Sequence, residues 1–189
     1  MSPNPNSKVL LTSFDVWKSH HVSNASDDLI TELLNRELLT ENVHLLRKVT
    51  VDFQLAPETI IAKIQQLQPD IVVCCGMAER RSRLTVESNG TVDAETIHTS
   101  IDIHRLIQNL SFTKVSHDAG RFVCNHTYYT ILKYFCDAQL KSECVFIHVP
   151  VLNAENLEAV VQDFSTILSR LITKKEIDCN HAIDEYVRI

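Results

Sequence analysis

Short runs of consecutive apolar residues alternate along this chain with stretches in which apolar residues recur at helical spacing. The runs at Lys8 to Phe14, Val43 to Phe53 and Asp70 to Cys75 have the length of buried strands. Between them, Asn24 to Leu38 and Pro57 to Leu67 place apolar residues three or four positions apart, which predicts helices. The first part of the chain therefore predicts two strand-helix units followed by a third strand.

The second half of the chain continues this alternation. The expected elements are, in order, an extended piece at Leu84 to Glu87, a turn at Ser88 to Thr91, a helix over His98 to Leu110, a strand at Phe112 to Ser116, a helix that contains Cys124, a strand at Cys144 to Val149 and a helix over about Ala154 to Ile172. Strands that alternate with helices and are apolar almost throughout indicate a parallel sheet covered on both faces. We therefore predict an α/β fold, a three-layer α/β/α sandwich around a mostly parallel sheet.

The size of the chain fits a single domain. It has 189 residues, of which 44% are apolar, enough to bury roughly 70% of the surface of the unfolded chain. The sequence contains no internal repeat and no linker that would divide it. We expect one domain over residues 1–189, with residues 1–7 and about 174–189 loosely ordered or peripheral.

Charge and cysteine usage narrow the choice of partners. The formal net charge is −6, with Lys and Arg scattered along the chain, which argues against nucleic acid. No apolar stretch approaches the length that spans a membrane. The six cysteines form no Cys-x-x-Cys pair, and the first residues do not resemble a secretion leader. We therefore expect a reduced, cytoplasmic protein that needs no cofactor.

Two segments of the second half carry candidate chemistry: SHDAGRFVCNHTYY, which contains Cys124, and VFIHVPVLNAEN, which contains His148. A thiol is a useful nucleophile only as the thiolate, so something must lower its pKa or remove its proton. Cys124 is expected in the first turn of a helix, where the helix dipole favours negative charge. His148 ends a predicted strand, at the sheet edge where ligands bind in α/β folds.

Periodicity alone gives both residues a simpler interpretation. Cys124 shares a helical face with Tyr128 and Ile131, as a core cysteine would. His148 alternates in phase with Cys144 and Phe146, which is typical of a buried histidine that packs in a core. A metal site is not expected, because the neighbouring His117, Asp118 and His126 match no ligand spacing.

Four blocks of the sequence, in order, resemble the pyroglutamyl peptidase I family of cysteine peptidases. They are KVLLTSFDVW followed by Asn24-Ala25-Ser26, PDIVVCCGMAERRSRLTVE at Pro69 to Glu87, SHDAGRFVCN at Ser116 to Asn125, and FIHVP at Phe146 to Pro150. The blocks span nearly the whole chain. The resemblance implies hydrolysis of the amide bond after an N-terminal pyroglutamyl residue, with a peptide as the partner. It also implies a homo-oligomer, since family members are often tetramers.

The resemblance further implies roles for individual residues. Cys124 matches the nucleophile, His148 the general base and Glu87 the residue that orients the imidazole. Arg81 matches a position that contributes electrostatically near the substrate. The backbone N–H of Cys124, at a helix start, is the expected oxyanion donor. Without the family match, Glu87 is a carboxylate at a strand end, and the arginines around position 81 form a solvated cluster.

The substrate pocket is expected at the first of these blocks. Phe14 and Trp17 match aromatic residues that enclose the flat lactam ring, and Asn24 matches an amide-contacting position. Phe14 and Trp17 fit ordinary core packing as well. A lactam is planar and uncharged, so apolar walls with one or two polar groups suit it.

The chain departs from the family pattern around that pocket. Ser13 replaces a usual glycine, Lys18-Ser19 replace a Gly-Gly step, and the segment between Glu87 and Cys124 is short. Glycines let a backbone approach a ligand closely, so their loss predicts a pocket of different shape. Two functions therefore stay open. The first is a cysteine exopeptidase with altered substrate preference, and the second is a weakly active or inactive binding or regulatory protein.

Overall fold

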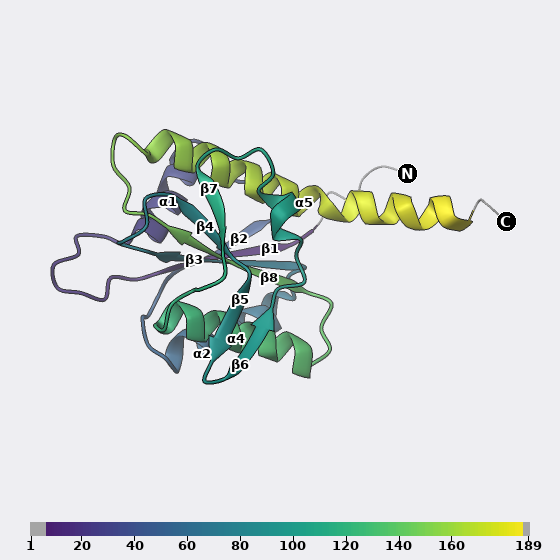
Figure 1. Cartoon of the computed structure of the whole chain (residues 1–189), viewed down its shortest axis with the longest axis horizontal. Helices are drawn as coiled ribbons and strands as arrows, with labels where there is room; N and C mark the ends of the chain where they lie inside the picture. The colour runs from purple at the N-terminus through teal and green to yellow at the C-terminus, as the bar shows by residue number, and fades with distance from the viewer. Residues whose placement is uncertain (1–6, 187–189) are drawn as a thin grey trace.

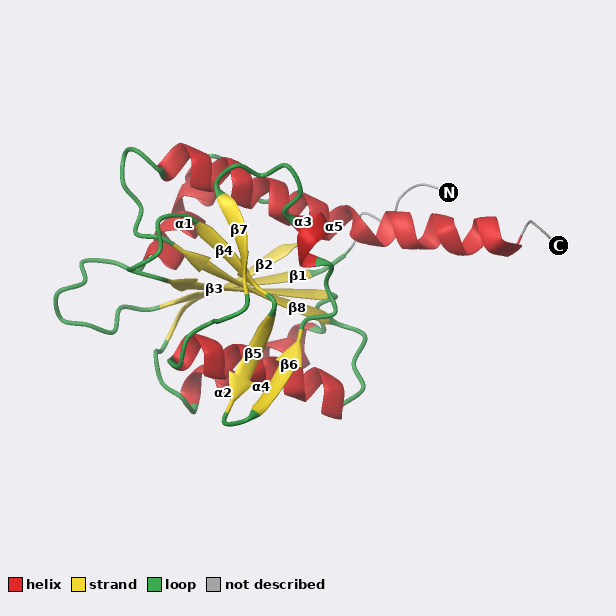
Figure 2. Cartoon of the chain, viewed as in Figure 1, coloured by secondary structure: helices red, strands yellow, loops and turns green. Residues whose placement is uncertain are grey.

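The computed structural model describes residues 7–186, with side chains as far as residue 173. The elements are β1 (Val9–Phe14), α1 (Ala25–Asn35), β2 (Val43–Val49), α2 (Leu55–Leu67), β3 (Ile71–Met77), β4 (Leu84–Glu87), β5 (Asn89–Val92), β6 (Glu95–His98), α3 (Ile103–Leu106), β7 (Thr113–Ser116), α4 (Val123–Asp137), β8 (Glu143–Val149) and α5 (Leu157–Tyr186). Figures 1 and 2 show how these helices and strands are arranged.

The central sheet has six strands in the order β2-β1-β3-β8-β4-β7. The first four are parallel, β4 runs antiparallel to β8, and β7 runs parallel to β4. Strands β1 and β3 are buried along their whole length, as their continuous apolar runs predict. The mostly parallel sheet expected from the sequence is confirmed.

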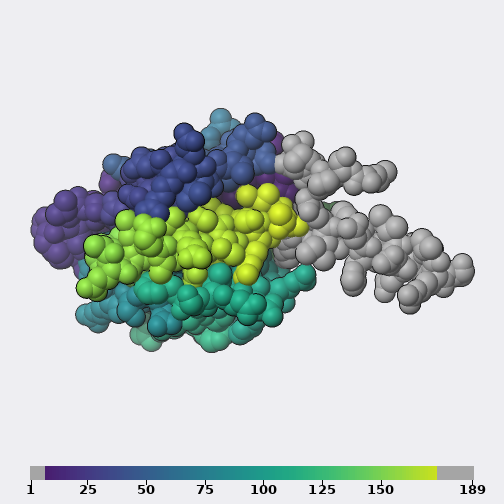
Figure 3. Space-filling model, turned by 90° about the horizontal axis from the view of Figure 1, so that it is seen from above, coloured from purple at the N-terminus to yellow at the C-terminus, as the bar shows by residue number. Residues whose placement is uncertain are grey.

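Helices cover both faces of this sheet, so the structure has the three predicted layers (Figure 2). Helices α1, α3 and α5 pack over one face, and α2 and α4 pack over the other. Figure 3 shows α5 beside α1 on the first of these faces. The face beneath α4 matters most for the candidate chemistry, because it carries Cys124.

Some predictions of local structure are wrong. Strand β2 was expected to be buried, but as the edge strand it is mostly half-buried. The predicted turn at residues 88–91 is largely strand β5, which pairs with β6 in a separate hairpin. The predicted helix over His98 to Leu110 is reduced to α3, because His98 belongs to β6 and the Asp102 side chain caps a helix that begins only at Ile103.

The ends of the chain were expected to be loose or peripheral. Ser7 is buried, at 4% exposure, and α5 continues as far as Tyr186. The other parts of that prediction, residues 1–6 and 187–189, lie outside the described residues, and so do the side chains after residue 173. Over the part of the chain that the structure covers, no helix combines the length and apolar character that membrane crossing requires.

The hairpin β5-β6 packs directly on α4. A Cβ atom on Gly90 would lie 2.5 Å from the backbone nitrogen of Tyr129, so only glycine allows this approach. The Asn125 side chain accepts a hydrogen bond from the Thr91 N–H at 2.9 Å and donates one to the Thr91 carbonyl. The first turn of α4 is therefore held by the hairpin.

Candidate active site

Cys124 is the second residue of α4, in the first turn of the helix, as predicted. Gly120, with φ of +82°, turns the chain ahead of the helix in a conformation that favours glycine. Phe122 precedes the helix and provides no side-chain cap. The first backbone N–H groups of a helix have no intrahelical partner, so this turn directs partial positive charge toward an oxyanion or a thiolate.

The sulfur atom of Cys124 lies over β3 at Gly76. A Cβ atom built on Gly76 would be 2.7 Å from Sγ of Cys124 and 2.9 Å from Cζ of Phe146. Both distances are too short for a real Cβ, so the absent side chain of residue 76 makes the space that the sulfur occupies. Gly76 is paired with His148 in the parallel register of β3 and β8. The strand pairing thus brings His148 beside the residue on which the thiol rests.

His148 is hydrogen-bonded to the predicted orienting carboxylate. Its Nδ1 atom is 2.8 Å from Oε1 of Glu87, and both side chains are buried. The two residues meet because β4 is antiparallel to β8, with Thr85 opposite His148 and Glu87 opposite Phe146. If Nδ1 donates its proton to the carboxylate, Nε2 is left as the nitrogen that can accept a proton.

Arg81 binds the same oxygen of this carboxylate as His148 does. Its Nη1 atom donates to Oε1 of Glu87 and to Oγ1 of Thr85, and its Nη2 atom donates to the Asp118 carbonyl at 2.8 Å. The guanidinium group therefore joins β4 to the segment that leads into α4. The sequence resemblance placed Arg81 near the substrate, and here its hydrogen bonds go to the protein.

The pKa of the Cys124 thiol is raised to about 12. Burial is the main cause, and the nearby Cys74 and Glu87 add to it, whereas the backbone N–H of Cys124 and the charge of Arg81 act in the opposite direction. By its exposed surface the Cys124 side chain is half-buried. The position at a helix start does not by itself lower this pKa, and removal of the proton by a base stays the prediction for this thiol.

The pKa of Glu87 is held below its ordinary value, although burial alone would raise it. The hydrogen bond from His148, together with the charges of His148 and Arg81, outweighs the burial. Glu87 is therefore ionised near neutral pH. An ionised carboxylate at Nδ1 stabilises a positively charged imidazole, as a base requires when it takes a proton.

The two aromatic residues expected at the substrate lie in different surroundings. Phe14 is 2% exposed and packs in the core on the α4 side of the sheet, with its ring 6.4 Å from that of Phe146. Trp17 is half-buried, with its ring 6.2 Å from that of Phe122, the residue just before α4. Trp17 thus lies near the start of the Cys124 helix. The interpretation of Phe14 as a packing residue is consistent with its burial.

Asn24 caps α1. Its Oδ1 atom accepts from the Ser26 N–H at 3.0 Å and from the Ser26 hydroxyl at 2.8 Å, and its Nδ2 atom donates to the Asp15 carbonyl at 2.9 Å. These bonds fix the loop that follows β1. A direct substrate contact of Asn24 stays a prediction.

A cavity of about 650 Å³ opens beside the first turn of α4. Its walls come from the segment before the helix, from α4 itself and from β5, and they include Gly120, Phe122, Asn125, His126 and Thr91. Phe53 also lines the cavity, with its ring 5.9 Å from that of Phe122. The space therefore lies beside residues that flank Cys124 and has a mixed polar and aromatic lining.

Two features of this site were not singled out from the sequence as functional. Gly76 ends a buried strand, and nothing local indicates that a sulfur from a distant helix lies over it. The hydrogen bonds between the Asn125 side chain and Thr91 of β5 also depend on a hairpin that the sequence pattern did not predict. The only sequence signal for the role of Gly76 is its place in the family-like block at Pro69 to Glu87.

Comparisons with known proteins give one consistent match. The family description "Pyroglutamyl peptidase" matches residues 7–99 and 91–177. A pyrrolidone-carboxylate peptidase of Thermoanaerobacter pseudethanolicus is 28% identical over 177 residues, covering 79% of this chain and 85% of the relative. One from Brevibacillus brevis is 27% identical over 170 residues, with 76% and 78% covered.

Solved structures are similar in fold. Pyroglutamyl peptidase I of Bacillus amyloliquefaciens superposes with a TM-score of 0.71 at 21% identity, covering 85% of this chain and 94% of the other. Pyrrolidone carboxyl peptidase from Thermococcus litoralis gives 0.75 at 16% identity, with 92% and 96% covered. Sequence and fold therefore lead to the same group of proteins.

Proposed function

Because the chain belongs to the pyroglutamyl peptidase family, we propose that it is a cysteine exopeptidase that hydrolyses the amide bond after an N-terminal pyroglutamyl residue. The observation that carries the proposal is one juxtaposition. The sulfur of Cys124 lies over Gly76, the strand partner of Gly76 is His148, and His148 is hydrogen-bonded to an ionised Glu87. These contacts support a site in which α4 supplies the nucleophile, β8 the base and β4 the orienting group.

The proposed reaction begins when Cys124 attacks the carbonyl carbon of the pyroglutamyl residue. His148 takes the thiol proton and returns it to the amine of the departing peptide, so the first step leaves an acyl-enzyme thioester. A water molecule, deprotonated by the same imidazole, then attacks the thioester and releases pyroglutamate and the free thiol. The developing oxyanion is stabilised by the N–H groups at the start of α4.

The raised pKa of Cys124 gives this mechanism a specific form. In the free protein the thiol is protonated, so the enzyme does not hold a preformed thiolate. Proton transfer to His148 must accompany binding or attack, and the ionised Glu87 makes it more favourable by stabilising the imidazolium.

The remaining predicted site residues have proposed roles at a distance from the reacting bond. Trp17 and Phe14 supply the aromatic side of the lactam pocket, with Trp17 the more accessible of the two. Asn24 fixes the loop that carries Trp17. Arg81 acts as a positioning residue that holds Glu87. The cavity beside α4 has room for the peptide that follows the pyroglutamyl residue.

The direct test is release of aminomethylcoumarin from its pyroglutamyl amide under reducing conditions. Wild type is expected to release the fluorophore, and Cys124→Ser and His148→Ala are expected to lose at least about a hundredfold in kcat/KM. Cys136→Ser is the matched control, because Cys136 is an exposed cysteine on the same helix. Release by wild type no faster than by Cys124→Ser would exclude the proposed activity.

The high thiol pKa also supports a second candidate, a protein that binds pyroglutamyl peptides and turns them over slowly or not at all. Calorimetric titration of the Cys124→Ser variant with a pyroglutamyl tripeptide distinguishes the two. Binding without turnover by wild type favours the second candidate. Turnover by wild type favours the first. A peptide with an N-terminal proline, which lacks the lactam carbonyl, is the control ligand.

A further inference from the structure

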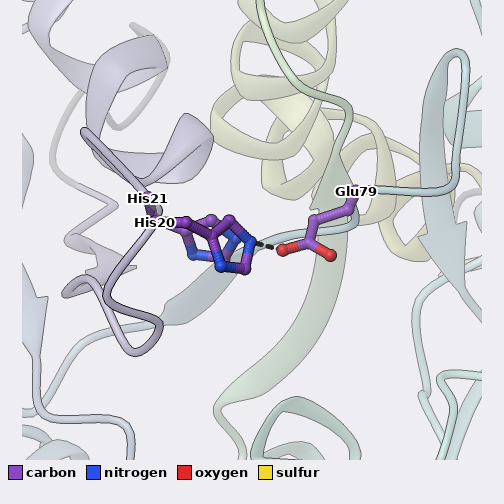
Figure 4. A group of neighbouring side chains, drawn as sticks. All are labelled: His20, His21 and Glu79. Atoms are coloured by element: carbon purple, nitrogen blue, oxygen red, sulfur yellow. Dashed lines mark hydrogen bonds and ion pairs between the residues drawn. The ribbon is translucent and has the colours of Figure 1, made fainter.

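A group of metal-ligating side chains lies outside the catalytic residues, at the ends of β1 and β3. His20 and His21 belong to the loop between β1 and α1, in a turn closed by a hydrogen bond from the His21 N–H to the Lys18 carbonyl at 3.0 Å. Glu79 follows β3 by two residues. Figure 4 shows the Glu79 carboxylate directed toward the two imidazoles across the gap between the segments.

The three side chains have the geometry of a ligand set. One ligand atom from each lies within 4.8 Å of those of the other two. The imidazole rings of His20 and His21 are 4.5 Å apart between centroids, and Nε2 of His21 contacts Oε1 of Glu79. A modest outward adjustment would let one ion contact both imidazoles and the carboxylate at bonding distances of about 2.0–2.2 Å.

His21 supplies an independent observation that favours a ligand. Its side chain is only 8% exposed, and its Nδ1 atom is buried without a hydrogen-bond partner. A buried polar atom without a partner costs free energy, so protein histidines usually use both nitrogens. The edge-to-face contact with the Trp17 ring holds the imidazole in this position but gives Nδ1 no hydrogen-bond partner. Nε2 of this ring contacts Glu79, and coordination through Nδ1 would give the second nitrogen the partner that it lacks.

The charge at the site favours a cation. Lys18 donates to both carboxylate oxygens of Glu79, at 2.8 and 3.0 Å, so this carboxylate already binds one cationic group. The Lys18 ammonium lies on a flexible stem and is 42% exposed. It can therefore leave the carboxylate when a divalent ion arrives, and it competes with that ion until then.

We propose that His20, His21 and Glu79 bind a divalent transition-metal ion of the Zn²⁺ or Ni²⁺ type. Two imidazoles and a carboxylate suit these ions, and an exposed site with three protein ligands leaves a coordination position for water. The bound ion joins the loop that carries Trp17 to the segment after β3. The ion takes no part in the proposed hydrolysis. No local spacing in the sequence indicates this site, because Glu79 is far along the chain from both histidines.

The single tryptophan of the chain reports on this site. The ring of Trp17 is 4.5 Å from that of His21, so a paramagnetic ion such as Ni²⁺ bound there should quench its fluorescence. The full-length protein is titrated with Ni²⁺, and Zn²⁺ is then added to displace it. We expect saturable quenching at one site per chain and recovery of the fluorescence on addition of Zn²⁺.

Substitutions locate the site. His20→Ala and Glu79→Gln should weaken Ni²⁺ binding by about tenfold or more, since loss of supporting residues alone costs that much at metal sites. His20 is exposed, so its removal leaves packing intact. Lys18→Met should strengthen binding, because it removes the competing ammonium. His104→Ala is the matched control, an exposed histidine on α3 that should bind as wild type does.

Two results would overturn the proposal. One is an absence of saturable quenching up to millimolar Ni²⁺. The other is quenching that His20→Ala and Glu79→Gln leave at the wild-type affinity, which would assign the ion to the cysteines or to other histidines. Circular dichroism of each variant verifies that a loss of binding does not reflect unfolding.

Discussion

The sulfur of Cys124 occupies the space that a side chain on Gly76 would fill, with only 2.7 Å between Sγ and the position of an added Cβ. This contact packs α4, which covers one face of the sheet, against β3 within the sheet. Gly76 is in turn paired with His148 on the neighbouring strand, so the Cys124 sulfur lies over the strand partner of His148. The properties of the site depend on this contact.

Replacing Gly76 by alanine should therefore remove activity. The new methyl group would meet the half-buried Cys124 sulfur and the buried Phe146 ring, so either the thiol moves or the strand does. We expect overpacking to lower the free energy of unfolding by about 1–3 kcal/mol. We also expect kcat/KM to fall by more than the fraction of protein that this destabilisation would unfold. Urea unfolding and the fluorogenic assay measure the two effects.

Gly90→Ala is the control for that substitution. A Cβ there would collide with the backbone of Tyr129, so stability should fall in a similar way while the surroundings of the Cys124 sulfur stay unchanged. If Gly90→Ala lost as much activity as Gly76→Ala at equal stability, the specific role of Gly76 would be wrong.

Alkylation of Cys124 should be slow at neutral pH and should increase steadily above pH 9. Burial raises the pKa of this thiol to about 12, so the thiolate fraction grows with pH throughout that range. Peptide mapping by mass spectrometry after iodoacetamide treatment compares Cys124 with the exposed Cys136 in one sample. A Cys124 rate that levels off near pH 7 would show that an ion pair with His148 exists in the free protein.

Glu87 should stabilise the fold in a pH-dependent way. Its pKa is lowered on folding, so its contribution is present above its ordinary pKa of 4.5 and is lost as the pH falls through the lower folded value. The difference in unfolding free energy between wild type and Glu87→Gln should therefore shrink below pH 4.5. Urea unfolding from pH 3 to pH 7 measures it, and a difference that grows on acidification would contradict the assignment.

Ser13, which replaces a usual glycine of the family, should contribute to stability. Its hydroxyl donates to Asp27 at 2.8 Å and accepts from the Lys48 N–H at 3.1 Å, and Arg47 completes the pairing of Asp27. Ser13→Ala should cost about 1–2 kcal/mol, because it leaves the Lys48 N–H without this partner. Ser19→Ala, at an exposed position of the following loop, should cost little. Equal thermal midpoints for the two variants would contradict this account.

The sequence by itself determined the elements whose pattern is strong and local. The apolar runs of β1, β3 and β8 and the helical spacing of α1 and α4 predicted their positions, because these residues are buried whatever their exact neighbours. The family-like blocks identified Cys124, His148 and Glu87 as candidates. The hydrogen bond between Glu87 and His148 agrees with that grouping, and the catalytic roles stay predictions.

Only the tertiary structure decided how those residues affect one another. The antiparallel direction of β4, the hairpin β5-β6 and the short α3 depend on partners distant in the chain, such as the Thr99 hydroxyl, which donates to the Cys144 carbonyl at 2.7 Å. The pKa of the Cys124 thiol also depends on the tertiary structure, because desolvation is set by the packing around the sulfur and local sequence does not encode it. The group formed by His20, His21 and Glu79 also depends on the tertiary structure, because the segments that follow β1 and β3 bring these residues together.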